Sequence, residues 1–272
     1  MGIIIAVLLF SFIIIFHELG HFLLAKKNGI RVDEFSLGLG PTLFGKQIGE
    51  TKFSLKLLPF GGACMMGEDD ADDLSEGSFN SKSVWARMSV IAAGPIFNLI
   101  LACIFCFILI MITGYRSPEI TGVLDGYSAQ EEGLRAGDVI TEINGRNVHI
   151  WDDVSLYTLT HADEAPFKVE YERDGKKYTA KLEPRQLEGD AVPLLGVTSG
   201  DIVKPGIFKS IEYSVYKVKY WMNYTVDSLR MLVTGQAGLK DLSGPVGIVS
   251  AVDNMYPVSY THLRAHETGR NL

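Results

Sequence analysis

The chain has 272 residues, of which 47% are hydrophobic, and a formal net charge of -7. It is too long for one small domain and too apolar for a disordered chain. The acidic balance, with no block rich in lysine or arginine, excludes nucleic acid as an expected partner. Of the three cysteines, Cys103 and Cys106 lie in an apolar stretch, so we expect no disulfide framework.

The first element is an apolar segment over residues 1–27, long enough to cross a membrane. It lacks a basic start and a cleavage site of small residues, so we expect a retained transmembrane helix and no signal peptide. Within it, His17 and His21 project from the same helix face and can bind one metal ion. Glu18 is placed to act as general base on a metal-bound water. A carboxylate in lipid costs about 2.5–3.5 kcal/mol on insertion scales, so a function must account for it.

Residues 28–88 form the loop between the two apolar segments. Alternating polar and apolar residues over 52–57 predict a strand, and the glycines and proline over 59–62 predict a turn or a short hairpin. A sheet edge near a protease site would hold a substrate extended for attack. An ordinary amphipathic hairpin on the membrane surface explains the pattern equally well.

The second membrane span is predicted over residues 89–114, which carry no charge. Gly94, Asn98, Ala102 and Cys106 recur every four residues and predict close packing against another helix. Asn98 offers a donor and an acceptor at membrane depth. It either only packs, or it also holds a substrate backbone or a developing oxyanion.

Basic residues flank the loop at 28–88, and they set the expected orientation. By the positive-inside rule the loop is cytoplasmic, and the chain beyond residue 114 is extracytoplasmic. The residues that carry this prediction are Lys26, Lys27, Arg31, Lys82 and Arg87. Arg116, after the second span, reduces the asymmetry.

Residues 118–198 read as a small soluble β-rich domain, with short apolar runs between turns rich in Gly, Asp and Asn. Asp174-Gly175 between two alternating segments predicts a β-hairpin. His149 and His161 have no ligand residues beside them, so we expect ordinary surface or core histidines. Residues 204–257 then form a helical segment with aromatic residues and lysines, a candidate membrane-surface helix.

Taken in chain order, six stretches resemble one family. They are FHELGHF at 16–22, SLGLGPTLFG at 36–45, LLPFGGACMMGED at 57–69, AAGPIFNLILA at 92–102, GVLDGYSAQEEGLRAGDVITEING at 122–145 and LSGPVGIVSA at 242–251. The set resembles the site-2 protease family of intramembrane zinc metalloproteases (M50), of the bacterial regulator of sigma-E protease type.

The resemblance implies an α-helical multi-pass membrane protein with an inserted small β-rich PDZ-like domain at 118–198. It also implies a membrane-associated β-hairpin at 53–66 and Zn2+ as the cofactor. The implied site residues are His17 and His21 as zinc ligands, Glu18 as catalytic base, and Gly94, Pro95 and Asn98 along the substrate path.

The implied activity is regulated intramembrane proteolysis. A metalloendopeptidase of this kind would sit in the bacterial inner membrane with its PDZ-like domain outside the cytoplasm. Its substrates would be single-span membrane proteins, such as anti-sigma factors or signal-peptide remnants. The PDZ-like domain would bind peptide C-termini and sieve these substrates.

One part of the family pattern has no match. The third zinc ligand of the family is an aspartate in a Leu-Asp-Gly motif on a later membrane helix. The match at 124–126 lies in the PDZ-like region, where a β-turn explains it, so we do not expect Asp125 to bind metal. Residues 258–272 are polar and resemble a translated sequencing adapter. We therefore expect a C-terminally truncated chain with a non-native tail, in which the His262 and His266 spacing arises by chance.

Two other functions stay open. The chain could be a PDZ-bearing membrane adaptor or an inactive fragment, because the expected third ligand is absent. A soluble zinc protease with a buried metal-binding helix leaves the uncharged run at 89–114 unexplained. Stoichiometric zinc that a chelator removes would distinguish the protease from the adaptor.

Overall fold

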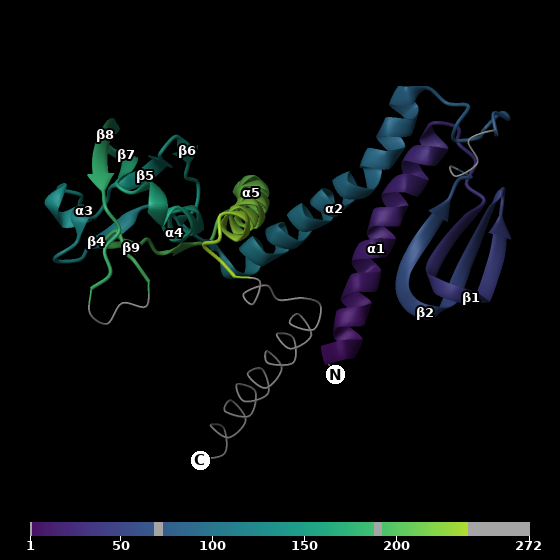
Figure 1. Ribbon diagram of the computed structural model, residues 1–272, viewed down its shortest axis with the longest axis horizontal. Helices are drawn as coiled ribbons and strands as arrows, with labels where there is room; N and C mark the ends of the chain where they lie inside the picture. Colours follow the sequence, from purple (N-terminus) through teal and green to yellow (C-terminus); the bar gives the residue numbers. More distant parts are fainter. Residues whose placement is uncertain (1, 68–72, 188–191, 239–272) are drawn as a thin grey trace, which may run out of the picture. The chain divides into compact units, whose positions relative to one another are not determined.

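The computed structural model describes residues 2–67, 73–187 and 192–238 (Figure 1). The chain divides into two compact units, one up to Leu101 and the other from Ala102. The expectations for 239–257, for the tail at 258–272 and for His262 and His266 fall outside the described residues.

The first unit contains two apolar helices and one sheet. Its elements are α1 (Gly2–Lys27), β1 (Glu34–Ile48), β2 (Thr51–Met65) and the first part of α2 (Val84–Thr113). The α1 helix ends because Gly29 adopts a φ of 65°, which lets the Ile30 amide donate to the Ala25 carbonyl at 2.9 Å. Ile30 is thereby turned into the core of this unit.

Both α1 and α2 are long and apolar enough to cross a membrane. Most of their large apolar side chains are exposed, from Leu8 and Phe12 on α1 to Ile104 and Ile112 on α2. Such surfaces suit lipid as the surrounding solvent. The two predicted apolar segments are helical as expected, although α2 already begins at Val84.

The sheet of the first unit is built from two strongly curved strands. Residues 34–37 pair with 52–55 on one side and with 62–65 on the other, while 42–48 pair with 51–56. Figure 1 shows the curved strands beside α1. The predicted strand at 52–57 is confirmed. The turn expected at 59–62 is wrong, because β2 continues through these residues and curves instead of reversing.

Three phenylalanines join the sheet to the end of α1. Phe22 lies 5.3 Å from Phe35 and 5.7 Å from Phe53, measured between ring centroids. Aromatic contacts at such distances stabilise beyond the area that they bury. The last turns of α1 are therefore fixed against β1 and β2.

The second unit contains the end of α2, a β-rich domain and a long helix. Its elements are β3 (Tyr115–Arg116), β4 (Ile120–Val123), α3 (Ser128–Glu131), β5 (Val139–Ile143), β6 (Arg146–Asn147), α4 (Trp151–Thr160), η1 (Ala162–Glu164), β7 (Phe167–Arg173), β8 (Lys176–Leu182), β9 (Val197–Ser199), β10 (Ile202–Val203) and α5 (Ile207–Val233). A four-stranded sheet has the order β6-β5-β7-β8, and β4-β9 and β10-β3 form two small sheets.

The β-rich domain buries its own core, which includes Ile120, Ile140, Ile143, Phe167 and Leu182. The hairpin predicted at Asp174-Gly175 is confirmed between β7 and β8. Both turn residues have positive φ, 51° and 73°, as a two-residue hairpin turn requires.

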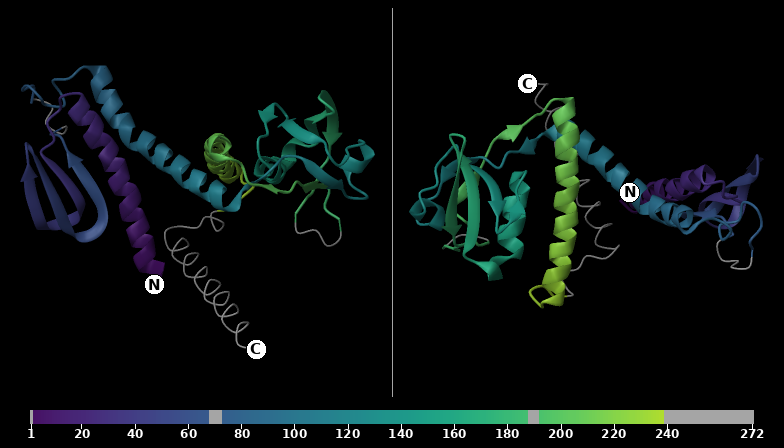
Figure 2. Two further views of the ribbon diagram at one scale, coloured as in Figure 1. Left: turned by 180° about the vertical axis from the view of Figure 1, so that it is seen from behind. Right: turned by 90° about the horizontal axis from the view of Figure 1, so that it is seen from above.

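The α5 helix runs along the β-rich domain (Figure 2). Arg146 donates to Asp227 at 2.8 Å, and Arg230 donates to Asp163 at 2.9 Å. The ring of His149 stacks on Tyr216. The opposite face of α5 exposes large apolar side chains, among them Phe208, Val215, Met222, Val226 and Leu229.

Candidate active site

The histidines of α1 face one point on α2. His17 and His21 lie one helical turn apart, with ring centroids separated by 4.9 Å. A Cβ built on Gly94 would overlap the Nε2 atoms of both rings. The two nitrogens therefore converge on a space that exists because residue 94 has no side chain. Zn2+ binds imidazole nitrogens at about 2.0–2.1 Å, so convergence of this kind is what a shared metal ion needs.

A second glycine brings the two helices together. A Cβ on Gly20 would lie 2.6 Å from the carbonyl oxygen of Ala93 and 2.9 Å from the ring of Phe97. Small residues let membrane helices approach closely, and the approach here places residues 90–98 of α2 against the histidines. The sequence His-Glu-Leu-Gly-His thus places a packing residue, Gly20, between its two histidines.

The backbone of α2 fixes the tautomer of His21 in the form that leaves Nε2 free to accept a metal ion. Its Nδ1 lies 2.7 Å from the carbonyl oxygen of Val90. A carbonyl can only accept, so Nδ1 carries the proton and donates. The lone pair of the neutral ring is then on Nε2, the atom that faces Gly94. Metal-binding histidines typically donate their other ring N–H in this way.

His17 has a different partner. Its Nδ1 lies 3.0 Å from Nδ2 of Asn98. The Oδ1 atom of Asn98 is buried and has no hydrogen-bond partner among the described residues. The structure thus brings Asn98 and Gly94 to the histidines. Pro95 is exposed.

Glu18 points toward the sheet. A Cβ built on Gly62 would lie 3.5 Å from Cγ of Glu18 and 2.9 Å from the carbonyl oxygen of Ser36. Gly62 belongs to the segment 62–65, which pairs with 34–37 on one side. No strand pairs with its other side among the described residues. The side chain of Glu18 therefore lies against a strand that has one unpaired edge among the described residues.

The residues present fit zinc, as far as the described chain reaches. They supply two converging imidazole nitrogens, a carboxylate on the same helix and a space between the rings. A catalytic zinc takes three protein ligands, and the described residues contain no cluster of three His, Cys, Asp or Glu side chains. Asp125 lies in a turn of the second unit, where it accepts a hydrogen bond from Gln130 at 2.7 Å.

Sequence reasoning missed the carbonyl of Val90 as the partner of His21 and Gly62 as the neighbour of Glu18. A backbone carbonyl carries no side-chain signature, so no residue pattern indicates the first. The paired glycines at 61–62 were visible, but they indicated a turn. Their role in the strand follows only from the fold.

Comparison with known proteins gives a consistent result. Residues 5–265 match Peptidase family M50. A protein of Clostridium acetobutylicum with the provisional name of zinc metalloprotease is 37% identical over 248 residues, covering 91% of this chain and 73% of the relative. The regulator of sigma-W protease RasP of Bacillus subtilis is 28% identical over 341 residues, covering 94% of this chain and 81% of the relative.

Among solved structures, the chain is similar to the PDZ domain of an SdrC-like protein from Listeria monocytogenes. The two share 25% identity with a TM-score of 0.28, over 31% of this chain and 88% of that domain. The match to the peptidase family covers nearly the whole chain, and the clostridial relative exceeds 30% identity. The chain therefore belongs to peptidase family M50, the membrane-embedded site-2 protease family, and is a metalloendopeptidase with zinc as its cofactor.

Proposed function

We propose that this protein cleaves single-span membrane proteins within or beside the bilayer. Anti-sigma factors and signal-peptide remnants are the substrates that we infer. The observation that carries the proposal is the convergence of the His17 and His21 Nε2 atoms on Gly94 of a second apolar helix. A metal site between two such helices serves a substrate that arrives through the membrane.

We assign the bound zinc to His17 and His21 and the role of general base to Glu18. When bound, zinc supplies a Lewis acid that polarises the scissile carbonyl and lowers the pKa of a water molecule. Glu18 accepts the proton of the attacking water and can pass it to the leaving amine. Its place on α1, next to His17, keeps the carboxylate beside the ligands throughout.

The open edge of the segment 62–65 gives the substrate a place to bind. A helical substrate hides its scissile carbonyl in its own hydrogen bonds, and pairing with a strand edge exposes it. Glu18 lies against Gly62, so a strand added at this edge would run past the carboxylate. We therefore place the scissile bond beside Gly62.

We propose that Asn98 positions His17. To bind zinc through Nε2, the ring of His17 must carry its proton on Nδ1, and this N–H then needs an acceptor. A half-turn of the Asn98 amide about its Cβ–Cγ bond would bring Oδ1 to the position that Nδ2 holds, 3.0 Å from Nδ1. This contact favours the positioning role over binding of an oxyanion.

The β-rich domain offers a second place for peptides. A cavity of about 250 Å3 lies between α4 and the chain around β9, with Val154 and Thr158 on one side and Leu195 and Val197 on the other. An apolar groove between a helix and a strand edge suits the C-terminus of an extended peptide. We propose that this domain, on the extracytoplasmic side, selects substrates by their trimmed ends.

The test replaces Glu18 by Gln in the protein expressed in its membrane. Loss of a general base lowers the rate about 10²–10⁴-fold, so cleavage of a single-span reporter should fall by this factor. Zinc content, measured on the purified protein, should stay unchanged. The control is Glu119→Gln, which removes an exposed carboxylate on the β-rich domain.

Undiminished cleavage by the Glu18→Gln protein would remove Glu18 from the mechanism. A protein without zinc that a chelator can extract would instead support the non-catalytic adaptor, for which the groove at α4 is the relevant site.

A further inference from the structure

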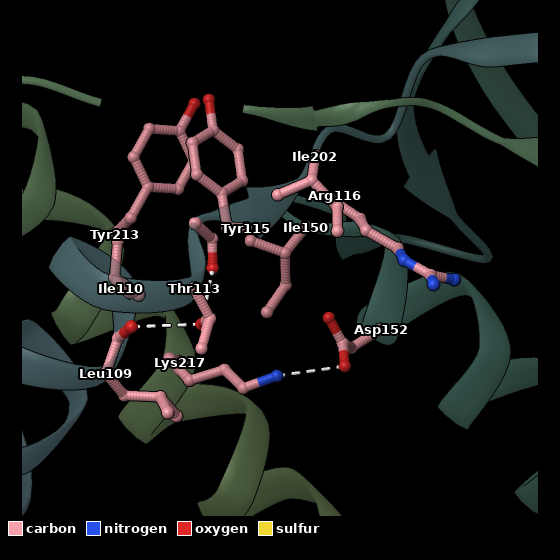
Figure 3. Close-up of a pocket in the computed structure, with 11 residues that line it drawn as sticks. Leu109, Ile110, Thr113, Tyr115, Arg116, Ile150, Asp152, Ile202, Tyr213 and Lys217 are labelled. Carbon is pink, nitrogen blue, oxygen red and sulfur yellow. Dashed lines mark hydrogen bonds and ion pairs between the residues drawn. The ribbon is translucent and has the colours of Figure 1, made fainter. Parts of the chain in front are cut away.

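A cavity of about 210 Å3 lies where the chain leaves α2, inside the second unit (Figure 3). Its lining includes neither of the two histidines of α1 and shares no residue with the peptide groove at α4. Its walls come from α2, β3 and α5, with the base of α4 and β10 between them. The lining includes Leu109 and Thr113 of α2, Tyr115 and Arg116 of β3, and Tyr213 and Lys217 of α5.

The walls of the cavity are well fixed. Gly114 has a φ of 76°, and a Cβ there would lie 2.6 Å from the carbonyl oxygen of Val203. This glycine lets the chain leave the helix and pair at once with β10. The rings of Tyr115 and Tyr213 stack with centroids 3.7 Å apart. In Figure 3 their hydroxyl groups point the same way.

The cavity has an excess of positive charge. Lys217 donates to Asp152 at 2.9 Å, which neutralises this carboxylate. Arg116 is exposed and forms no ion pair with any carboxylate of the described residues. Glu212, the nearest acid along α5, accepts a hydrogen bond from Tyr216. An arginine without a carboxylate partner is suited to bind phosphate through two parallel N–H bonds.

The cavity lies at the end of an apolar span. The α2 helix carries no charge from Ser89 to Thr113, and Tyr115 and Arg116 follow at its end, where Tyr213 of α5 stacks on Tyr115. Tyrosines at this level are typical of the interface between hydrocarbon and water. Leu109 lines the cavity and is also exposed on the helix, as is Ile112 one turn later. A ligand with a charged head and apolar chains would satisfy both parts of the wall.

We propose that this cavity binds the phosphate head group of an anionic phospholipid. Arg116 holds the phosphodiester, Lys217 supplies a further donor, and the acyl chains lie along Leu109 and Ile112. The lipid then ties α2, β3 and α5 together at the membrane surface. Free inorganic phosphate shares the charge of the head group but would leave the apolar wall uncovered.

The experiment measures binding of dihexanoyl phosphatidylglycerol to the chain purified in a non-ionic detergent. Arg116→Gln should weaken binding about fivefold or more, since one basic residue near a membrane surface contributes about this factor. Arg116→Lys keeps the charge and should retain most of the affinity. Arg135→Gln, at an exposed arginine outside the cavity, should leave it unchanged.

Two competitors identify the ligand. Inorganic phosphate at the same concentration should fail to displace the lipid, and dihexanoyl phosphatidylcholine should bind more weakly. Equal affinity of the Arg116→Gln and unaltered chains would overturn the site. Displacement by inorganic phosphate would show that the cavity binds a free anion and not a lipid. Equal binding of phosphatidylcholine would show that the cavity does not recognise the negative charge of the head group. A thermal unfolding curve shows that each variant is folded before binding is compared.

Discussion

Gly94 has a role that its size alone explains. The space above its Cα receives the Nε2 atoms of His17 and His21, and any Cβ would fill it. We expect Gly94→Ala to exclude the metal while the helix itself forms, because alanine favours helices more than glycine does. Zinc measured per chain should fall toward zero, with cleavage lost in parallel.

A matched control for this change is Ala92→Val, which adds volume to α2 at an exposed position. It should keep its zinc. If Gly94→Ala also keeps stoichiometric zinc, the two nitrogens do not share a metal at this position.

The contact between Asn98 and His17 leads to a second prediction. Partners that orient a metal-binding histidine typically contribute 10–100-fold to metal affinity. Asn98→Ala should therefore weaken zinc binding about 10–100-fold in a competition with a fluorescent chelator. Asn98→Asp, whose carboxylate can accept from Nδ1, should restore it. An affinity that is unchanged in Asn98→Ala would leave this residue as a packing residue.

At this scale the sequence predicted the histidines and Glu18 from spacing on one helix, because the helical period alone brings them to one face. It could not predict what holds the rings. The carbonyl of Val90 reaches His21 only because Gly20 lets the helices touch at Ala93. A contact of this kind depends on the crossing of two helices, which no local pattern specifies.

Among the larger elements, the four-stranded sheet of the β-rich domain has a buried ion pair between Asp138 and Arg173. Asp138, next to β5, is 1% exposed and accepts hydrogen bonds from Arg173 at 2.6 and 2.7 Å. Burial opposes ionisation of this carboxyl group, but the bonds from Arg173 and from the Arg135 amide outweigh it. The pKa of Asp138 therefore lies below its ordinary value of 3.8.

The pKa of Asp138 is lower in the folded chain than in the unfolded chain, so its ionised form stabilises the fold. This contribution is complete at a pH above the ordinary pKa, and it is lost as the pH falls through the lower pKa of the folded chain. We expect the urea midpoint of this domain to fall as the pH drops below about 4. Arg173→Met should lower the midpoint at neutral pH, since it leaves a buried carboxylate unpaired. Arg185→Met, which breaks an exposed pair with Glu131, should have little effect.

A midpoint unchanged by Arg173→Met would show that solvent reaches Asp138 in the folded domain. Tryptophan fluorescence can follow the transition, because Trp151 packs against the core of this domain.

The two sheets differ in how far the sequence predicted them. The β7–β8 hairpin followed from Asp174-Gly175, since its turn residues and its alternation agree. The curvature of β2 did not, because glycines can end a strand or bend it. In β2 they bend it, and residues 62–65 pair with 34–37 instead of turning back on 52–57. The stacking of His149 on Tyr216 was equally invisible, because the two residues are distant in sequence.

For the whole molecule, the distribution of basic residues predicts an orientation that labelling can test. In a chain with all three cysteines replaced by serine, a cysteine at Ser75 should resist a membrane-impermeant maleimide in intact cells. A cysteine at Asp174, in the β7–β8 turn, should react. Both should react after the cells are opened. Reaction at Ser75 in intact cells would reverse the orientation and place the peptide groove in the cytoplasm.

The close approach of Gly20 to Ala93 also affects how such an enzyme is made. When only α1 has left the ribosome, the chain already carries both histidines and Glu18, but it lacks Val90 and Asn98 to orient the rings. We expect the rings of His17 and His21 to become ordered only after α2 has entered the same membrane and docked, because Val90 and Asn98 lie on α2. We therefore expect a half-made chain to carry the residues of a protease without its activity, and to bind zinc only once the two helices have assembled.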